Sequence, residues 1–289
     1  MQRRKFITAL SLSALTPLAM NLQGLKNLAD SLPATERMPV MFAGHGSPMN
    51  AIEKNEYSNT WANIGKQIQT PKAILCVSAH WQTNGTKITA MEMPPTIHDF
   101  GGFSQALFDV QYAAPGSPAM AQATIDLVKN TQIVSDYDWG LDHGCWSVLK
   151  PMFPDAKIPV LQLSLDFYMT PQQHYDLGKQ LFELRNKGVL IIGSGNIVHN
   201  LGMIQWSETA YDWAIEFDTQ IKKLIDSGDH AAIINYKNLG KAAQLSIPSN
   251  EHYLPLLYSL ALQDSKDNLS YFNESVGMGS MSMRSVMLS

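Results

Sequence analysis

Short apolar segments alternate with helix-like segments over most of this chain, and this alternation limits its fold more than any other feature. Strands are expected in the apolar runs, at residues 38–42, 73–77, 158–165 and 189–192. Helices are expected over residues 57–68, 117–129, 170–186, 211–227 and 252–262, and two short strands after residue 270. Strands that alternate with helices favour an α/β fold, a three-layer domain with a central, largely parallel or mixed sheet flanked by helices.

The composition agrees with one large catalytic domain over residues 38–289. Of the 289 residues, 45% are hydrophobic and 16% are charged, which is enough to bury a large core. The net charge of -4 is spread evenly, so no basic face for nucleic acid is expected. Cys76 and Cys145 cannot form a disulfide framework and lack zinc-ribbon spacing. We expect buried free thiols, with a single bridge between them as the alternative. The sequence does not indicate an oligomeric state.

Residues 1–30 resemble an export signal. Arg3, Arg4 and Lys5 precede an uncharged apolar stretch over residues 6–20, as in the basic and hydrophobic regions of such signals. The paired arginines are typical of the twin-arginine pathway and predict a periplasmic protein. An ordinary basic terminus would instead leave the protein cytoplasmic. The stretch is short for a membrane span, and no later apolar run is long enough for one, so no stable span is expected.

Histidines recur where strands end, which is the first sign of a functional site. His45 lies between two glycines after the first strand, and His80 and His199 follow later strands. Ligands of open α/β sheets bind beyond the carboxyl ends of the strands. A single histidine at such a place is more often an ordinary polar group, but the recurrence favours a shared site. His174 and His230 lie on polar helical stretches, and we expect them at the surface.

Three further histidines lie in turns or loops that suit a site. His143 precedes Gly144, His252 follows Glu251, and His98 lies in a loop bounded by prolines and glycines. Imidazoles suit iron, zinc, copper and nickel, and a site rich in histidine but poor in cysteine favours a catalytic metal with open positions. The sequence therefore predicts a mononuclear metal enzyme.

Six motifs, in order, give the chain a specific resemblance to a known family. They are Gly44-His45-Gly46-Ser47-Pro48, Ser78-Ala79-His80-Trp81, Pro94-Pro95-Thr96-Ile97-His98-Asp99-Phe100-Gly101-Gly102, Asp142-His143-Gly144, Ser194-Gly195-Asn196-Ile197-Val198-His199-Asn200 and Glu251-His252-Tyr253-Leu254-Pro255-Leu256. Together they resemble the DOPA-type extradiol aromatic ring-opening dioxygenases, from about Met38 to the C-terminus. The export-like segment lies outside the resemblance.

The resemblance implies a role for each histidine. His45, His80 and His252 match metal ligands, and His199 matches a fourth histidine that is either a ligand or an acid/base group. His143 matches a catalytic pocket histidine suited to proton transfer. In more distant relatives a glutamate completes the ligand set, and Glu251 is the nearest candidate for that alternative. The residues expected to line the substrate pocket are His98, Trp81 and Phe100, with Phe103 beside them.

The implied reaction is cleavage of a catechol ring by O₂, with a DOPA-like or related phenolic substrate and a muconic semialdehyde-type product. It requires one divalent metal, Fe(II) for catalysis, although Zn(II) can occupy such a site in purified protein. A histidine near neutral pKa suits the deprotonation of a catechol. Asp142 is either a partner that orients a histidine or a turn residue before Gly144. The alternatives are a zinc-dependent hydrolase on the same site and a catalytically inactive small-molecule-binding relative.

Overall fold

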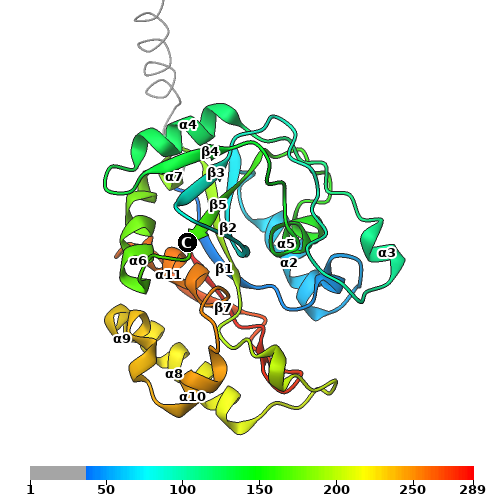
Figure 1. The fold of residues 1–289 in the computed structure, drawn as a ribbon, viewed down its shortest axis with the longest axis vertical. Coiled ribbons are helices and arrows are strands. Elements are labelled where there is room, and N and C mark those ends of the chain that lie inside the picture. Colours follow the sequence, from blue (N-terminus) through cyan, green and yellow to red (C-terminus); the bar gives the residue numbers. More distant parts are fainter. Residues whose placement is uncertain (1–36) are drawn as a thin grey trace, which may run out of the picture. The chain divides into compact units, whose positions relative to one another are not determined.

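The structure is a computed structural model that describes residues 37–289, and the expected export segment lies outside the described residues. A mixed eight-stranded sheet runs through the middle of this part of the chain (Figure 1). Its strand order is β4-β3-β5-β2-β6-β1-β10-β7. The strands are β1 (Val40–Gly44), β2 (Ala73–Thr83), β3 (Thr86–Thr89), β4 (Ile133–Asp136), β5 (Val160–Asp166), β6 (Val189–Gly195), β7 (Leu269–Phe272) and β10 (Ser285–Leu288). The shorter β8 (Val276–Gly277) and β9 (Met281–Ser282) form a separate pair.

The centre of the sheet is parallel, and antiparallel pairs join it to the strands on either side. β1 and β2 both run parallel to β6, and β2 runs parallel to β5. β10 is antiparallel to β1, and β3 is antiparallel to β5. In the parallel centre Gly44 pairs with Gly195 and Ser78 pairs with Ser194, so the carboxyl ends of β1, β2 and β6 meet at one edge. This edge is where His45 and His80 lie.

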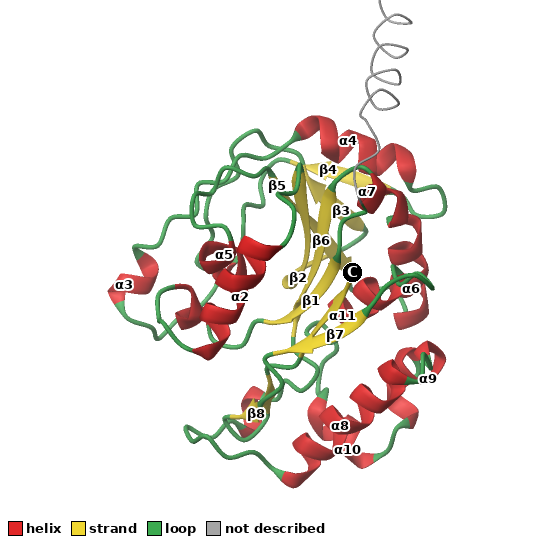
Figure 2. Cartoon of the chain, turned by 180° about the vertical axis from the view of Figure 1, so that it is seen from behind, coloured by secondary structure: helices red, strands yellow, loops and turns green. Residues whose placement is uncertain are grey.

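Helices cover both faces of the sheet, which confirms the three-layer fold (Figures 1 and 2). The helices are α2 (Glu56–Gln67), α3 (Gln105–Phe108), α4 (Pro118–Leu127), α5 (His143–Met152), α6 (Pro171–Gln180), α7 (Phe182–Asn186), α8 (Asp212–Asp226), α9 (His230–Ile234), α10 (Lys241–Ser246) and α11 (Leu254–Ala261). Helices α2 and α5 lie on one side, and α6 and α11 on the other. Consecutive β1 residues Met41 and Phe42 pack into separate apolar clusters, one for each face. This alternation is what a strand buried on both sides requires.

Local signals set several of the boundaries. The Ser117 side chain caps α4 directly before Pro118, and Thr170 does the same for α6 before Pro171, as predicted. The helix expected over residues 170–186 is divided into α6 and α7 at Leu181. Strand β2 runs on to Thr83, six residues beyond the apolar run that predicted it, so His80 lies within the strand.

The sequence-based prediction missed β3, β4 and α5, and also the short helices α3, α9 and α10. Strand β3 is four residues long and only Ile88 in it is apolar, so it leaves no apolar run. Helix α5 is buried over eight of its ten residues and contains Pro151, so it shows no contrast between an apolar and a polar face. The expected strands after residue 270 are present as two antiparallel pairs around Gly277 and Gly279, β8 with β9 and β7 with β10.

His174 is fully buried, so its expected place at the surface is wrong. Its Nδ1 lies 3.0 Å from the hydroxyl of Tyr258 on α11, because α6 packs its buried side against that helix. His230 is partly buried, and its Nδ1 lies 2.8 Å from the hydroxyl of Tyr175. Cys76 and Cys145 are free and buried, as expected.

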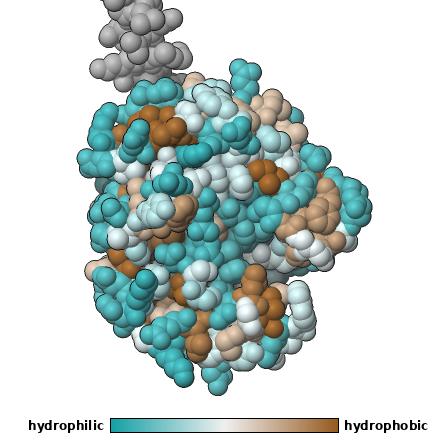
Figure 3. All heavy atoms as spheres, in the orientation of Figure 1, coloured by the Kyte–Doolittle hydropathy of each residue, from teal (hydrophilic) through white to brown (hydrophobic). Residues whose placement is uncertain are grey.

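On the face shown in Figure 3, hydrophobic residues form separate small groups between hydrophilic ones. Among the described residues, Tyr168 and Trp206 are exposed aromatic residues, and single exposed apolar side chains are normal on a protein surface. Within residues 37–289, none of the helices combines the length and apolar character needed to cross a membrane.

Candidate active site

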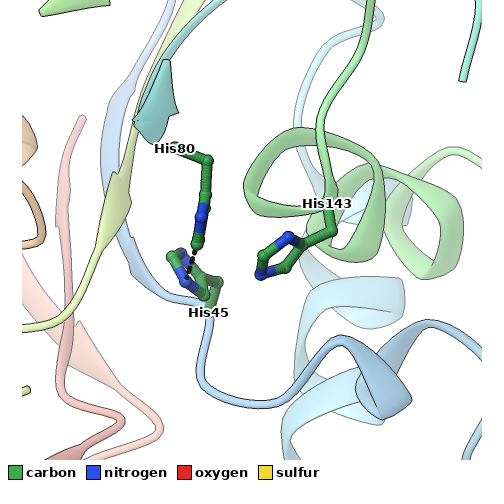
Figure 4. A group of neighbouring side chains, drawn as sticks. All are labelled: His45, His80 and His143. Carbon is green, nitrogen blue, oxygen red and sulfur yellow. Dashed lines mark hydrogen bonds between the residues drawn. The ribbon is translucent and has the colours of Figure 1, made fainter. Parts of the chain in front are cut away.

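His45 follows the last residue of β1, and His80 lies in β2 just beyond its pairing with β6, so the two meet at the same edge of the sheet. The chain turns sharply after His45, since Gly46 adopts a φ of 60°, a conformation that favours glycine. The Nε2 atoms of His45 and His80 are 3.2 Å apart, with ring centres separated by 5.0 Å (Figure 4). The pairing of parallel strands thus places two residues 35 positions apart in direct contact.

His143 completes a first group of three. It is the first residue of α5, and its ring points toward the other two histidines (Figure 4). Its ring centre lies 3.8 Å from that of His80 and 5.8 Å from that of His45. The three residues offer nitrogens that lie within 4.8 Å of one another, and they could hold a metal ion.

His199 and His252 bring a second group to the same place. The ring of His252, which precedes α11, lies 5.2 Å from the ring of His45 and 5.0 Å from that of His80. His199 lies flat against His252, with ring centres 3.4 Å apart and an angle of 7° between the planes. With Glu251, these two also form a group that could hold a metal. The five histidines predicted as metal ligands or acid/base groups therefore belong to one cluster, which does not include His98.

The contacts of the Nδ1 atoms show which nitrogens are free to act as ligands. The Ser194 hydroxyl donates its only proton to the Gly144 carbonyl at 2.5 Å. It can then only accept from His45 Nδ1, 3.0 Å away, so the His45 proton lies on Nδ1 and its Nε2 keeps a lone pair. His252 Nδ1 similarly faces Glu251 Oε1 at 3.2 Å.

This arrangement fits a metal ion held by Nε2 atoms. Lone pairs on two nitrogens 3.2 Å apart repel unless a proton or a cation lies between them. Nitrogens bound to one ion at about 2.1 Å lie about 3.0 to 3.4 Å apart for right-angle to tetrahedral geometry. Nδ1–H groups held by oxygen acceptors are also the usual partners that orient metal-binding histidines. The donor set therefore suits a divalent metal of the kind that imidazole binds.

Burial keeps these imidazoles neutral. Burial, with the neighbouring histidines, lowers the pKa values of His45 and His252 well below 6.5. Burial also lowers the pKa of His80 to about 3, and that of His199 to about 4. Since a metal binds only the neutral ring, the cluster is ready for an ion at neutral pH without releasing protons.

Besides Glu251, the carboxylates of Asp142 and Asp99 lie near the cluster, and their contacts differ. Asp142 caps α5 through the backbone N–H of Cys145 and accepts from Ser78 and Gln162, so it is a turn and capping residue. Asp99 instead lies against the histidines, with Oδ2 at 2.9 Å from His143 Nδ1 and 3.4 Å from His80 Nδ1. Sequence reasoning quoted Asp99 and Ser194 within motifs but gave them no role. The only feature of the sequence that could have pointed to Asp99 and Ser194 is that each is a polar residue inside a motif that contains a histidine.

Aromatic residues form a wall beside His143. The Phe100 ring meets His143 edge-on at 5.5 Å and contacts Phe103 and Phe108. The His98 ring packs against Phe100, and its Nε2 lies 3.0 Å from the Val110 carbonyl oxygen. Trp81 is buried and stacks on Trp139 at 5.8 Å. Phe100 is thus the predicted pocket residue in contact with a cluster histidine, and the pocket roles of all three stay predictions.

Comparison with known proteins shows the class of enzyme. Residues 38–282 match the family described as the catalytic LigB subunit of aromatic ring-opening dioxygenase. The chain therefore belongs to this family of extradiol ring-opening dioxygenases, which are oxidoreductases, and the resemblance found in the motifs is confirmed.

Individual relatives agree with this assignment. The chain is 45% identical over 265 residues to a 4,5-DOPA dioxygenase extradiol from Escherichia coli K12, covering 90% of this chain and 97% of that protein. It is 34% identical to the protein of the same name from Beta vulgaris, covering 83% and 92%. The crystal structure of an uncharacterized protein from E. coli K12 superposes with a TM-score of 0.75 at 39% identity, covering 88% of this chain and all of that one.

Proposed function

We propose that this enzyme opens the ring of a catechol, DOPA-like or a related phenolic, with O₂ to give a muconic semialdehyde-type product. The observation that carries the proposal is the pair of His45 and His80 Nε2 atoms 3.2 Å apart, with the His252 ring about 5 Å from both rings. The names of the relatives support a DOPA-like substrate.

In this proposal His45, His80 and His252 hold one divalent metal. Fe(II) bound there supplies the redox chemistry and favours the ionised catechol. Each of the three rings has its Nδ1 beside an oxygen atom, of Ser194, Asp99 and Glu251 respectively, which fixes the ring and leaves Nε2 for the ion.

His143 is proposed to accept a proton from the catechol and to return it as the ring opens. It lies at the rim of the cluster, between the metal-binding rings and the Phe100 wall, where a flat aromatic substrate would pack. His199 is proposed to act beside it, as a further ligand or as a second acid/base group. Metal content in a His199→Ala variant separates these two roles.

The test is anaerobic loading with Fe(II), followed by O₂ uptake measurements with a panel of catechols. We expect one O₂ consumed per ring and a yellow product. His45→Ala should lose the metal, whereas His143→Ala should keep it and lose about 10²- to 10⁴-fold in kcat.

Failure of the metal-loaded protein to consume O₂ with any catechol would overturn the proposal. Hydrolysis of esters or amides by the zinc form would then indicate a hydrolase, and unchanged binding of catechols by metal-free protein would indicate a binder. Normal turnover by His143→Ala would remove the proton-transfer role from that residue.

A further inference from the structure

We propose that Asp99 is the positioning residue of this site, and that its single Oδ2 atom fixes the ring protons of both His80 and His143. It would thereby couple one metal ligand to the acid/base group. The inference rests on the proposed function for its catalytic consequence, while the proton positions themselves can be tested without turnover.

The contacts of Asp99 divide between its two oxygens. Oδ1 accepts the backbone N–H of His143 at 2.9 Å. Oδ2 lies 2.9 Å from His143 Nδ1 and 3.4 Å from His80 Nδ1. A lone pair on either Nδ1 would lie close to a carboxylate oxygen and be repelled by it. Both rings are therefore expected to carry a proton on Nδ1, which leaves Nε2 of His80 for a metal and Nε2 of His143 for a substrate proton.

The carboxylate of Asp99 can only accept hydrogen bonds. An acceptor-only group is what both Nδ1 protons require.

The backbone around Asp99 is tied to the segment that carries His143. Ile97 donates to the Leu141 carbonyl at 2.7 Å, and Leu141 donates to the Pro95 carbonyl at 2.8 Å. The indole of Trp146 on α5 donates to the Ile97 carbonyl at 2.8 Å. Asp99 and His143 are thus held in one unit, and the distance between them does not depend on a free loop.

Asp99 Oδ2 lies close to His143 Nδ1, but the two atoms are not aligned for a hydrogen bond. Although Nδ1 and Oδ2 are 2.9 Å apart, the ring N–H does not point straight at the oxygen, and Nδ1 forms no aligned hydrogen bond. A small rotation of the ring would align it. Catalytic hydrogen bonds commonly tighten in this way once substrate is bound. Asp142, the other nearby carboxylate, cannot substitute, because its hydrogen bonds go to Ser78, Trp139, Gln162 and the Cys145 backbone.

The decisive variant is Asp99→Asn. The amide oxygen can still accept the His143 backbone N–H, so the loop should stay anchored. The amide NH₂ then faces both Nδ1 atoms and favours rings protonated on Nε2. We expect kcat with Fe(II) to fall about 10²-fold or more while KM changes little, and metal affinity to fall about 10- to 100-fold. Asp109→Asn, an exposed residue after α3, is the matched control and should resemble the unmodified enzyme.

¹⁵N NMR of histidine-labelled protein loaded with Zn(II) shows which ring nitrogen carries the proton. A purely structural role of Asp99 would leave that proton position unchanged. In the unmodified protein, His143 should be protonated on Nδ1. Its signal is assigned as the one that disappears in the His143→Gln variant. The Asp99→Asn variant should move that proton to Nε2. Unchanged proton positions together with an unchanged kcat in Asp99→Asn would overturn the inference. A lack of O₂ uptake by the unmodified enzyme would instead overturn the proposed function, and the NMR result would still decide the role of Asp99.

Discussion

At the scale of single residues, the site depends on where the imidazole protons lie. Burial makes the rings of His45, His80 and His252 neutral, but a neutral ring can carry its proton on either nitrogen. Ser194 places the His45 proton on Nδ1. Its hydroxyl donates its own proton to the Gly144 carbonyl and can therefore only accept a hydrogen bond from His45. A serine at the end of β6 thus prepares a ligand at the end of β1.

Removal of this hydroxyl should weaken metal binding without unfolding the protein. In Ser194→Ala, His45 loses the acceptor for its Nδ1 proton, so the ring is no longer held in the ligand form. We expect the affinity for Zn(II) or Fe(II) to fall about 10- to 100-fold in competition with a chelator. Ser147→Ala is the control, since Ser147 is equally buried and its hydroxyl has no partner among residues 37–289. Equal affinities in the two variants would count against the role of Ser194.

At the scale of elements, the site depends on how closely α11 approaches β6. A Cβ atom at Gly195 would lie 2.1 Å from the carbonyl oxygen of His252, and one at Gly193 would lie 2.3 Å from that of Pro255. The backbone of Asn196 also donates to the His252 carbonyl at 2.9 Å. The turn that carries His252 therefore rests directly on the strand, which sets the distance from His252 to His45 and His80.

Gly195→Ala should push this turn away from the sheet. We expect a loss of about 1–3 kcal/mol in the free energy of unfolding, together with weaker metal binding because His252 moves. Thermal unfolding and metal titration measure the two effects. Gly277→Ala is the matched control, because a Cβ atom there would lie 3.5 Å from the Glu208 carbonyl oxygen, an ordinary van der Waals contact. A Gly195→Ala protein with unchanged stability would show that the turn can shift freely.

At the scale of the whole molecule, buried neutral histidines make the fold sensitive to acid. His174 lies outside the site, and burial lowers its pKa to about 4 from the ordinary 6.5. The unfolded chain takes up a proton at this residue below pH 6.5, and the folded protein does not until about pH 4. The contribution of neutral His174 to the free energy of unfolding is therefore complete above pH 6.5. It is lost as the pH falls toward 4.

A His174→Gln variant should reduce this acid sensitivity. In metal-free protein, the unfolding free energy of the unmodified chain should fall more steeply between pH 6.5 and 4 than that of the variant. One proton accounts for about 1.4 kcal/mol per pH unit, so the two curves should diverge by about 3 kcal/mol across the window. Denaturant unfolding at several pH values measures the slopes. Parallel curves would mean that His174 takes up its proton in the folded state.

The fold class, the family and the grouping of histidines could be predicted from the sequence because each has a local signal. Apolar runs predicted β1, β2, β5 and β6, and histidines in glycine turns or at strand ends pointed to the site. The same reasoning misplaced His174, because burial of a helix face depends on a partner helix. It also gave Asp99 no role, because the sequence around a polar loop residue is the same whether or not that residue faces a histidine in the folded protein.

The sequence by itself therefore determined the alternation of strands and helices, the motifs of the family and the candidate histidines. Only the tertiary structure decided how these residues meet. Parallel pairing of β1 and β2 with β6 puts His45 and His80 in contact, and the packing of α5 and α11 brings in His143 and His252. Proton placement by Ser194 and Asp99 depends on distances of about 3 Å between segments far apart in the chain. Such distances follow from packing, which no local pattern of residues encodes.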